Sequence, residues 1–285
     1  MKIIVSGSKG AIGSNLVPHL WDKGHSVYET TTDITDFVNL EKEVAPYLET
    51  ADTWINLAAL VNTITCDAAG RHSFDANVKG EYNIAVLSKN AAIHHCYFST
   101  TAIYKPNVPI FEDQTKDPQT LYGFTKYLGE LTAEFVFKDR RQDLLIVRPC
   151  FAFGGDSDHS IGSKLIESAY LSNGQPLVVQ LDPENEKDYM SVSNLSDAIE
   201  QLIAKRSVGD FNISFGKPIK FGELVKIAEK IVGRKPNVYY MPEKDYMKNH
   251  VVDNSKVCEE TGWKPTVTVE QQMRKILEKI IKKYE

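Results

Sequence analysis

Two residues of the segment TLYGFTKYLGE (120–130) could act together in acid–base chemistry. Tyr122 and Lys126 are four residues apart, a spacing that makes side chains neighbours on one face of a helix. A phenol has a reference pKa of about 10, and a nearby cation lowers that pKa by favouring the phenolate. The pair therefore predicts a tyrosine that exchanges a proton with a substrate, although the same spacing is also common on ordinary surface helices.

A glycine-rich turn, GSKGAIG, forms a second candidate, with glycines at positions 7, 10 and 13. It lies between an apolar run at the start of the chain and an amphipathic segment at 11–24. Glycine permits a tight turn and a close approach of the backbone to a pyrophosphate, and a following helix offers free N–H groups and a positive dipole end. The spacing is Gly-x-x-Gly-x-x-Gly, and its context favours a dinucleotide site over a flexible turn.

Strands and helices alternate through the first half of the chain. Strand-like runs are expected at 2–7, 25–31, 52–59, 94–104 and 143–150, and helical runs at 11–24, 36–48, 74–91 and 120–138. Such alternation predicts βαβ units and a parallel sheet covered by helices on both faces. We therefore expect an α/β fold with a Rossmann-like doubly wound parallel sheet, whose ligands bind at the carboxyl ends of the strands.

The pattern changes after Pro149, where loops, short strands and helices are mixed. Strand-like runs are expected at 209–215 and 237–242, and helical runs at 220–233 and 268–284. This organisation predicts a dinucleotide-binding domain at 1–150. Residues 151–285 then form mainly a smaller C-terminal substrate-binding lobe, with some segments that return to the main sheet and no linker between the two parts.

The composition and net charge limit the classes of partner to be expected. The chain has 285 residues, 42% of them hydrophobic, and a formal net charge of -5, which gives no reason to expect nucleic acid or an anionic membrane surface as partner. Four widely spaced cysteines suit a reducing compartment, and no apolar run approaches the roughly 20 residues of a spanning helix. HHC (94–96) lacks further ligands at metal spacing, so no metal is predicted. We expect a soluble, cytoplasmic protein.

Several further segments resemble motifs of the extended short-chain dehydrogenase/reductase family, as do the glycine turn and the Tyr–Lys pair. The chain is identified as a member of its NAD(P)-dependent nucleotide-sugar epimerases, dehydratases and reductases, over nearly the whole length. The segments are DIT (33–35), NLAAL (56–60), NVKGEYNI (77–84), FSTTAIY (98–104), RPCFAFG (148–154), KDYMSVSNLSDAI (187–199) and DNSKVCEETGWKP (253–265).

The resemblance implies a catalytic set of Thr100, Tyr122 and Lys126. Thr100 would hydrogen-bond the substrate oxygen, Tyr122 would exchange the proton, and Lys126 would lower its pKa and bind the nicotinamide ribose. The implied cofactor-binding residues are Gly7, Ser8, Lys9, Gly10, Ala11, Ile12, Gly13, Thr31, Asp33, Ile34, Leu57, Ala58, Ala59, Asn77, Tyr122, Lys126 and Pro149. Those for substrate binding are Thr101, Phe151 and Lys187.

The resemblance also bears on the choice of cofactor. It puts Thr31 where an acid would bind the adenosine ribose, so no carboxylate is expected to repel a 2′-phosphate. Lys9 in the glycine turn could bind such a phosphate. NADP(H) is therefore expected in preference to NAD(H), with Asp33 as the ribose acid in the NAD(H) alternative.

Departures from the family pattern bear on the reaction. Phe151 stands where many epimerases have asparagine, Lys187 replaces the arginine of Arg-Asp-Tyr, and the Asp-Glu pair of dehydratases is absent after Thr100. These departures favour a reductase of the 4-keto group of a nucleotide-linked 4-keto-6-deoxy sugar, similar to dTDP-4-dehydrorhamnose reductase and suited to polysaccharide biosynthesis. His159 fits a solvent-exposed loop better than a second acid.

Two other functions stay open at this point. One is an NAD-dependent nucleotide-sugar 4-epimerase, and the other is a non-catalytic dinucleotide-binding protein, which would have no need of the catalytic set. The expected partner is a nucleotide sugar, and a homodimer is an option for the assembly.

Overall fold

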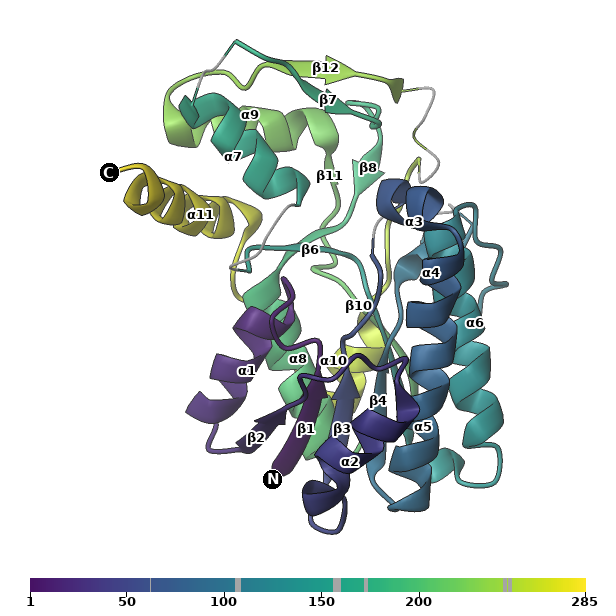
Figure 1. The fold of residues 1–285 in the computed structure, drawn as a ribbon. Helices are drawn as coiled ribbons and strands as arrows, with labels where there is room; N and C mark the ends of the chain where they lie inside the picture. Colours follow the sequence, from purple (N-terminus) through teal and green to yellow (C-terminus); the bar gives the residue numbers. More distant parts are fainter. Residues whose placement is uncertain (62, 106–108, 156–159, 172–173, 243–244, 246–247) are drawn as a thin grey trace.

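The computed structural model describes the chain except residues 62, 106–108, 156–159, 172–173, 243–244 and 246–247. The strands of its main sheet are β1 (Lys2–Ser6), β2 (Ser26–Glu29), β3 (Thr53–Asn56), β4 (His94–Phe98), β5 (Leu144–Pro149) and β10 (Gly209–Ile213). Within the described residues these six strands are all parallel, in the order β10-β5-β4-β3-β1-β2 (Figure 1). The order reverses at β1, the point where open parallel sheets bind their ligands.

Helices cover both faces of this sheet. They are α1 (Gly13–Asp22), α8 (Val192–Ala204) and α10 (Ser255–Thr261) on one face, and α2 (Phe37–Leu48), α5 (Gly80–Asn90) and α6 (Leu121–Val136) on the other. Side chains of a strand alternate between the two layers, as the pleat requires. In β1, Ile3 and Val5 pack with α1 and α8, whereas Ile4 packs with α2 and α5. The predicted α/β class is thereby confirmed.

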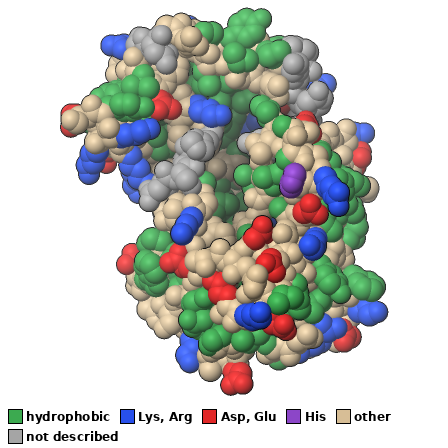
Figure 2. All heavy atoms as spheres, viewed as in Figure 1, with side chains coloured by type: hydrophobic (Ala, Val, Ile, Leu, Met, Phe, Trp, Pro, Cys, Tyr) green, Lys and Arg blue, Asp and Glu red, His purple; other side chains and the backbone are tan. Residues whose placement is uncertain are grey.

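A smaller lobe lies beyond the carboxyl ends of the strands (Figure 1). Its strands are β6 (Phe151–Phe153), β7 (Leu177–Val179), β8 (Glu186–Lys187), β9 (Tyr189–Ser191), β11 (Ile219–Lys220) and β12 (Val238–Tyr240), and its helices are α7 (Ile161–Leu171), α9 (Phe221–Val232) and α11 (Val269–Tyr284). Leu165, Leu224 and Met273 are 0% exposed in its separate core. Between lobe and main sheet the surface is hollowed (Figure 2).

Segments of the second half return to the main sheet, because β10 pairs with β5 and α8 packs on α1. The division at residue 150 itself stays a prediction. No helix of the described residues has the length and apolar character needed to cross a bilayer.

The run expected to be one helix at 74–91 is divided. α3 (Thr63–Ala69) and α4 (Arg71–Phe74) come first, followed by a π-helical turn (Asp75–Lys79) and then α5. Single π-helical turns are frequent at functional sites. Here the turn carries Asn77, whose amide donates a 2.9 Å hydrogen bond to Thr125 of α6.

The strand expected at 94–104 ends earlier, at Phe98. The Thr100 side chain accepts a hydrogen bond from Ala102 N and caps a 3₁₀ turn (Thr101–Ile103). Because the chain turns there, Thr100 lies at the carboxyl edge of the sheet rather than within a strand.

Candidate active site

The glycine turn leads from β1 into α1 with no room for side chains. Gly7 has a φ of +79°, and a Cβ on it would lie 2.6 Å from the Ala58 backbone nitrogen. A Cβ on Gly13 would lie 2.4 Å from the carbonyl oxygen of Ser8. Contacts this short allow only glycine at both positions. The turn therefore keeps bare backbone at the start of a helix, the arrangement that suits a pyrophosphate.

A second pair of glycines approaches the turn from the lobe. A Cβ on Gly155 would lie 1.8 Å from the carbonyl oxygen of Ala11, so the chain leaving β6 touches the glycine turn. Gly154, with a φ of +116°, is equally close to the Gln272 side chain. Sequence reasoning matched Gly154 to a motif but gave no sign of the contact between Gly155 and Ala11, which are more than 140 residues apart.

Asn77 shapes the turn at 56–60. Its side-chain oxygen accepts from Leu60 N at 2.8 Å, and its amide nitrogen donates to Leu60 O at 3.0 Å as well as to Thr125 Oγ1. Thr125 Oγ1 in turn donates to the carbonyl oxygen of Tyr122 at 3.1 Å. Asn77 thus connects the turn at 56–60, which is predicted to line the cofactor site, to the helix that carries Tyr122.

Tyr122 lies in the first turn of α6. The helix begins after Thr120, whose hydroxyl accepts a hydrogen bond from Gly123 N at 3.1 Å. Burial raises the pKa of Tyr122 to about 12, and a side-chain hydrogen bond with Thr100 acts in the opposite direction. The phenol is therefore protonated at neutral pH and interacts with the side chain of Thr100. The catalytic roles of the two residues stay predictions.

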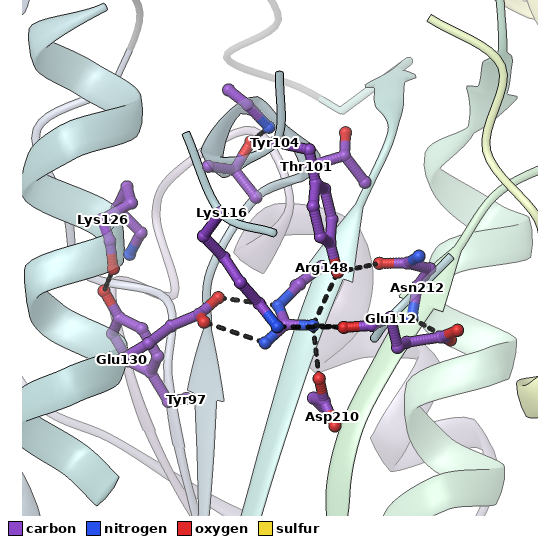
Figure 3. A network of polar contacts seen from close by, with 12 residues as sticks. Tyr97, Thr101, Tyr104, Glu112, Lys116, Lys126, Glu130, Arg148, Asp210 and Asn212 are labelled. Carbon is purple, nitrogen blue, oxygen red and sulfur yellow. Dashed lines mark hydrogen bonds and ion pairs between the residues drawn. The ribbon is translucent and has the colours of Figure 1, made fainter. Parts of the chain in front are cut away.

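Lys126 follows one turn later and is 3% exposed. Its Nζ atom is 4.3 Å from the centroid of the Tyr97 ring on β4, close to the network of Figure 3. Burial lowers the pKa of Lys126 to about 8, against the opposing effects of Glu81 and Glu130. Burial of the phenol dominates and raises the pKa of Tyr122. The predicted lowering of that pKa by Lys126 stays a prediction.

Glu81, which sequence analysis missed, is fully buried beneath the turn at 56–60. Its carboxylate accepts from His95 Nε2 at 2.7 Å and from Asn56 Nδ2 at 2.6 Å. His94 Nε2 lies 3.0 Å from the carbonyl oxygen of Ser207. The two histidines of HHC therefore serve the interior of the fold, and the described residues hold no group of three or more potential metal ligands.

Arg148 links the strands beneath α6. Its guanidinium donates to both carboxylate oxygens of Glu130, at 2.8 and 2.9 Å, and to the hydroxyl of Tyr104 at 2.6 Å. It also contacts Asp210 on β10, and Tyr104 donates to Asn212 at 3.2 Å (Figure 3). This network fixes the helix that carries Tyr122 and Lys126 against β5 and β10.

The two neighbouring threonines are used differently. Thr100 is 8% exposed, and its side chain is the one in contact with Tyr122. The hydroxyl of Thr101 donates instead to the carbonyl oxygen of Pro149 at 3.2 Å. The predicted substrate role of Thr101 therefore has to compete with a bond inside the protein.

Comparison with known families identifies this site. Residues 3–214 match the profile described as the NAD dependent epimerase/dehydratase family, which is well over half of the chain. The chain belongs to this family. As a member it is an NAD(P)-dependent enzyme, and the resemblance predicted from the sequence is confirmed at the level of the family.

Solved structures share the fold. The UDP-glucose 4-epimerase of Thermotoga maritima with UDP-glucose has 22% identity and a TM-score of 0.89, and MoeE5 in complex with UDP-glucose and NAD has 20% and 0.87, with both chains fully covered in each case. RMD from Pseudomonas aeruginosa complexed with NADPH has 21% identity and a TM-score of 0.84, covering 97% of this chain and 98% of its own. Among these neighbours MoeE5 contains NAD and RMD contains NADPH. The family to which this chain belongs is described as NAD dependent.

The end of β2 differs from its prediction. Glu43 on α2 reaches Thr31, accepting from its backbone nitrogen and from its hydroxyl, both at 2.8 Å. Its other carboxylate oxygen accepts from Thr32 N at 3.0 Å. The expectation that no carboxylate lies at this position is therefore wrong. The acid comes from the following helix and not from the strand, so the strand motif gave no sign of it.

The remaining predicted cofactor residues lie around these elements. Lys9 and Asp33 are exposed, and Asp33 accepts from Thr35 N at 2.8 Å. Ile34 is buried against Gly80. The structure brings the glycine turn (7–13), the turn at 57–59 and the catalytic set to the same edge of the sheet. Their contacts with a cofactor stay predictions.

Lys187 lies inside the lobe. It is 0% exposed, and its Nζ donates to Asp245 Oδ1 at 2.9 Å and to the carbonyl oxygen of Lys248 at 2.7 Å. Phe151 is half-buried, with its ring centroid 5.7 Å from the Lys187 ammonium and 5.7 Å from the Tyr189 ring. The structure thus turns the predicted substrate lysine inward. His159 lies outside the described residues.

Proposed function

We propose that this enzyme reduces the 4-keto group of a nucleotide-linked 4-keto-6-deoxy sugar. The observation that carries the proposal is the protonated phenol of Tyr122, which interacts with the Thr100 side chain at the sheet edge that also carries the glycine turn. Reduction of a carbonyl needs a proton donor at the oxygen, and a phenol whose pKa lies near 12 at rest holds its proton at neutral pH.

The glycine turn fits the dinucleotide that such a reaction needs. Side chains at Gly7 and Gly13 would collide with neighbouring backbone, so no side chain projects from these two positions. The N-terminus of α1 supplies donors there. A bound nicotinamide dinucleotide would supply the hydride that adds to the carbonyl carbon.

The chain itself supplies orientation and the proton. Thr100 and Tyr122 would both hydrogen-bond the substrate oxygen, and the O–H bond of Tyr122 breaks as the new O–H bond of the product alcohol forms. The negative charge left on the phenol is then favoured by the Lys126 cation, one turn away on the same helix. Lys126 is also placed to donate to ribose hydroxyls of the dinucleotide.

An epimerase is the second candidate, as the family and the epimerase fold of its neighbours allow. Its first half-reaction removes a proton from a substrate alcohol, which needs the phenolate form of Tyr122. The raised pKa of Tyr122 disfavours that form in the resting enzyme. The reductase is placed first because Phe151 stands where the resemblance puts asparagine in many epimerases.

The test incubates the protein with NADH or NADPH and a panel of dTDP-, GDP-, CDP- and UDP-linked 4-keto-6-deoxy sugars. Loss of the absorbance of the reduced nicotinamide, together with a product heavier by two hydrogens, supports the reductase. Isomerisation at constant mass, with bound cofactor not consumed, contradicts it in favour of the epimerase. Dinucleotide binding without turnover of any substrate would leave a non-catalytic dinucleotide-binding protein.

A further inference from the structure

The carboxylate of Glu43 is held firmly at the end of β2. One of its oxygens accepts from the backbone nitrogen and the hydroxyl of Thr31 and from the Tyr28 hydroxyl at 3.2 Å. The other accepts from Thr32 N. Burial acts to raise the pKa of Glu43, but the hydrogen bonds from Thr31 and Thr32 outweigh it and bring the pKa to about 2. The carboxylate is therefore charged near neutral pH.

The direction of these bonds decides what Thr31 offers to a ligand. A hydroxyl has one proton, and Thr31 Oγ1 donates it to Glu43. Exposed at the end of β2, the oxygen of Thr31 meets a ligand only as an acceptor. A ribose 2′-hydroxyl can donate to that oxygen. A 2′-phosphate has no proton to donate near neutral pH, and it would also face the fixed negative charge directly behind Thr31.

We infer that Glu43, acting through Thr31, is the residue that makes this enzyme prefer NAD(H) to NADP(H). The inference rests on the proposed function, in which the adenosine ribose of the dinucleotide lies at the end of β2. Lys9 has the opposite effect on a phosphate, but it is an exposed lysine, and exposed charges contribute little to binding. The immobilised carboxylate outweighs it.

Binding measurements test this without reference to turnover. Dissociation constants for NADH and NADPH are measured by fluorescence for the wild-type protein and for Glu43→Gln. We expect the wild type to bind NADH about tenfold more tightly or more. In Glu43→Gln the affinity for NADPH should rise by about tenfold while that for NADH changes by less than threefold, since the amide carries no charge and its oxygen still accepts from Thr31.

Three variants control the result. Glu41→Gln removes an exposed charge from the same helix and should leave the ratio of the two affinities unchanged. Asp33→Asn tests the other candidate acid, whose carboxylate accepts from Thr35 N, and should change the ratio less than Glu43→Gln does. Thr31→Val keeps the Glu43 charge but removes the acceptor, so it should weaken NADH binding while NADPH stays weak. This variant decides the matter if Glu43→Gln does not fold.

Tighter NADPH binding by the wild type, an unchanged ratio in Glu43→Gln, or a changed ratio in Asp33→Asn alone would each overturn the inference while leaving the proposed function intact. Absence of binding of either dinucleotide to the wild type would overturn both.

Discussion

Two buried lysines, one in each part of the molecule, are held in contrasting ways. Lys187 in the lobe has its ammonium bonded to Asp245 and to the carbonyl oxygen of Lys248. Lys126 at the sheet edge faces the Tyr97 ring, and among the described residues no carboxylate lies within ion-pair distance of its Nζ. The first lysine uses its donors inside the fold, whereas the second keeps donors for a ligand.

The carboxylates around Lys126 explain the difference. Glu130 is occupied by the two hydrogen bonds from Arg148, and Glu81 by those from His95 and Asn56. They act on Lys126 through charge alone and oppose the lowering of its pKa by burial. Lys126 is therefore held as a cation without a direct ionic partner. This arrangement suits a group that must bind ribose and stabilise a phenolate.

Replacing Lys187 should have the largest effect on stability. Lys187→Ala leaves the buried carboxylate of Asp245 without its cation, which we expect to lower the free energy of unfolding by about 3–5 kcal/mol. Urea denaturation measures this. Lys220→Ala removes an exposed ion pair with Glu184 in the turn before β8 and should leave the free energy of unfolding nearly unchanged.

The comparison of the two lysines would fail if Lys187→Ala were as stable as the wild type and instead raised the KM for the nucleotide sugar. Lys187 would then be a substrate ligand, as its motif predicted from the sequence.

The two lysines also show what could be predicted from the sequence. Tyr122 and Lys126 share one helix, so their spacing alone brings them together, and the same holds for the glycines between β1 and α1. The parallel sheet followed from the alternation of strands and helices. In each case the information lies within a few turns of chain, where backbone geometry decides the outcome.

Contacts between distant segments could not be predicted. Asp245 reaches Lys187 from 58 residues away, and Glu43 reaches Thr31 from a different element. In both cases the motif named the residue but not the partner that sets its chemistry. The direction of a side chain depends on packing across the fold, which residue spacing does not encode.

Tyr122→Phe tests the chemistry at the sheet edge. Loss of the proton donor should lower kcat by roughly 10²-fold or more, with dinucleotide affinity and unfolding free energy nearly unchanged because the ring remains. Tyr127→Phe, on the same helix, is the matched control and should retain full activity. Near-normal turnover by Tyr122→Phe on the true substrate would show that another group supplies the proton.

Replacement of Lys126 should change the free energy of unfolding in the opposite direction to replacement of Lys187. Burial holds the pKa of Lys126 near 8 in the folded protein, below its ordinary value of 10.5. The folded state therefore binds the proton less well than the unfolded state, and this contribution to stability rises with pH from about 8 to 10.5. Below pH 8, Lys126→Met should be at least as stable as the wild type while losing turnover and dinucleotide affinity.

The measurement is the difference in unfolding free energy between wild type and Lys126→Met as a function of pH. Because Lys187 is present in both proteins, its contribution cancels in this difference. A variant clearly less stable than the wild type at pH 7 would mean that Lys126 has a direct ionic partner after all, and that the two lysines are alike.

The smallest expected effects distinguish the two threonines. Thr100→Val removes the hydroxyl beside Tyr122 and should lower kcat by about tenfold, because one of two hydrogen bonds to the substrate oxygen is lost in the transition state. Thr101→Val removes a bond to the Pro149 carbonyl and should cost about 1 kcal/mol of unfolding free energy with little change in kcat. Because the two substitutions are identical in chemistry and adjacent in sequence, each is the control for the other. A larger loss of kcat in Thr101→Val than in Thr100→Val would contradict this assignment. Thr101, and not Thr100, would then be the residue that hydrogen-bonds the substrate oxygen.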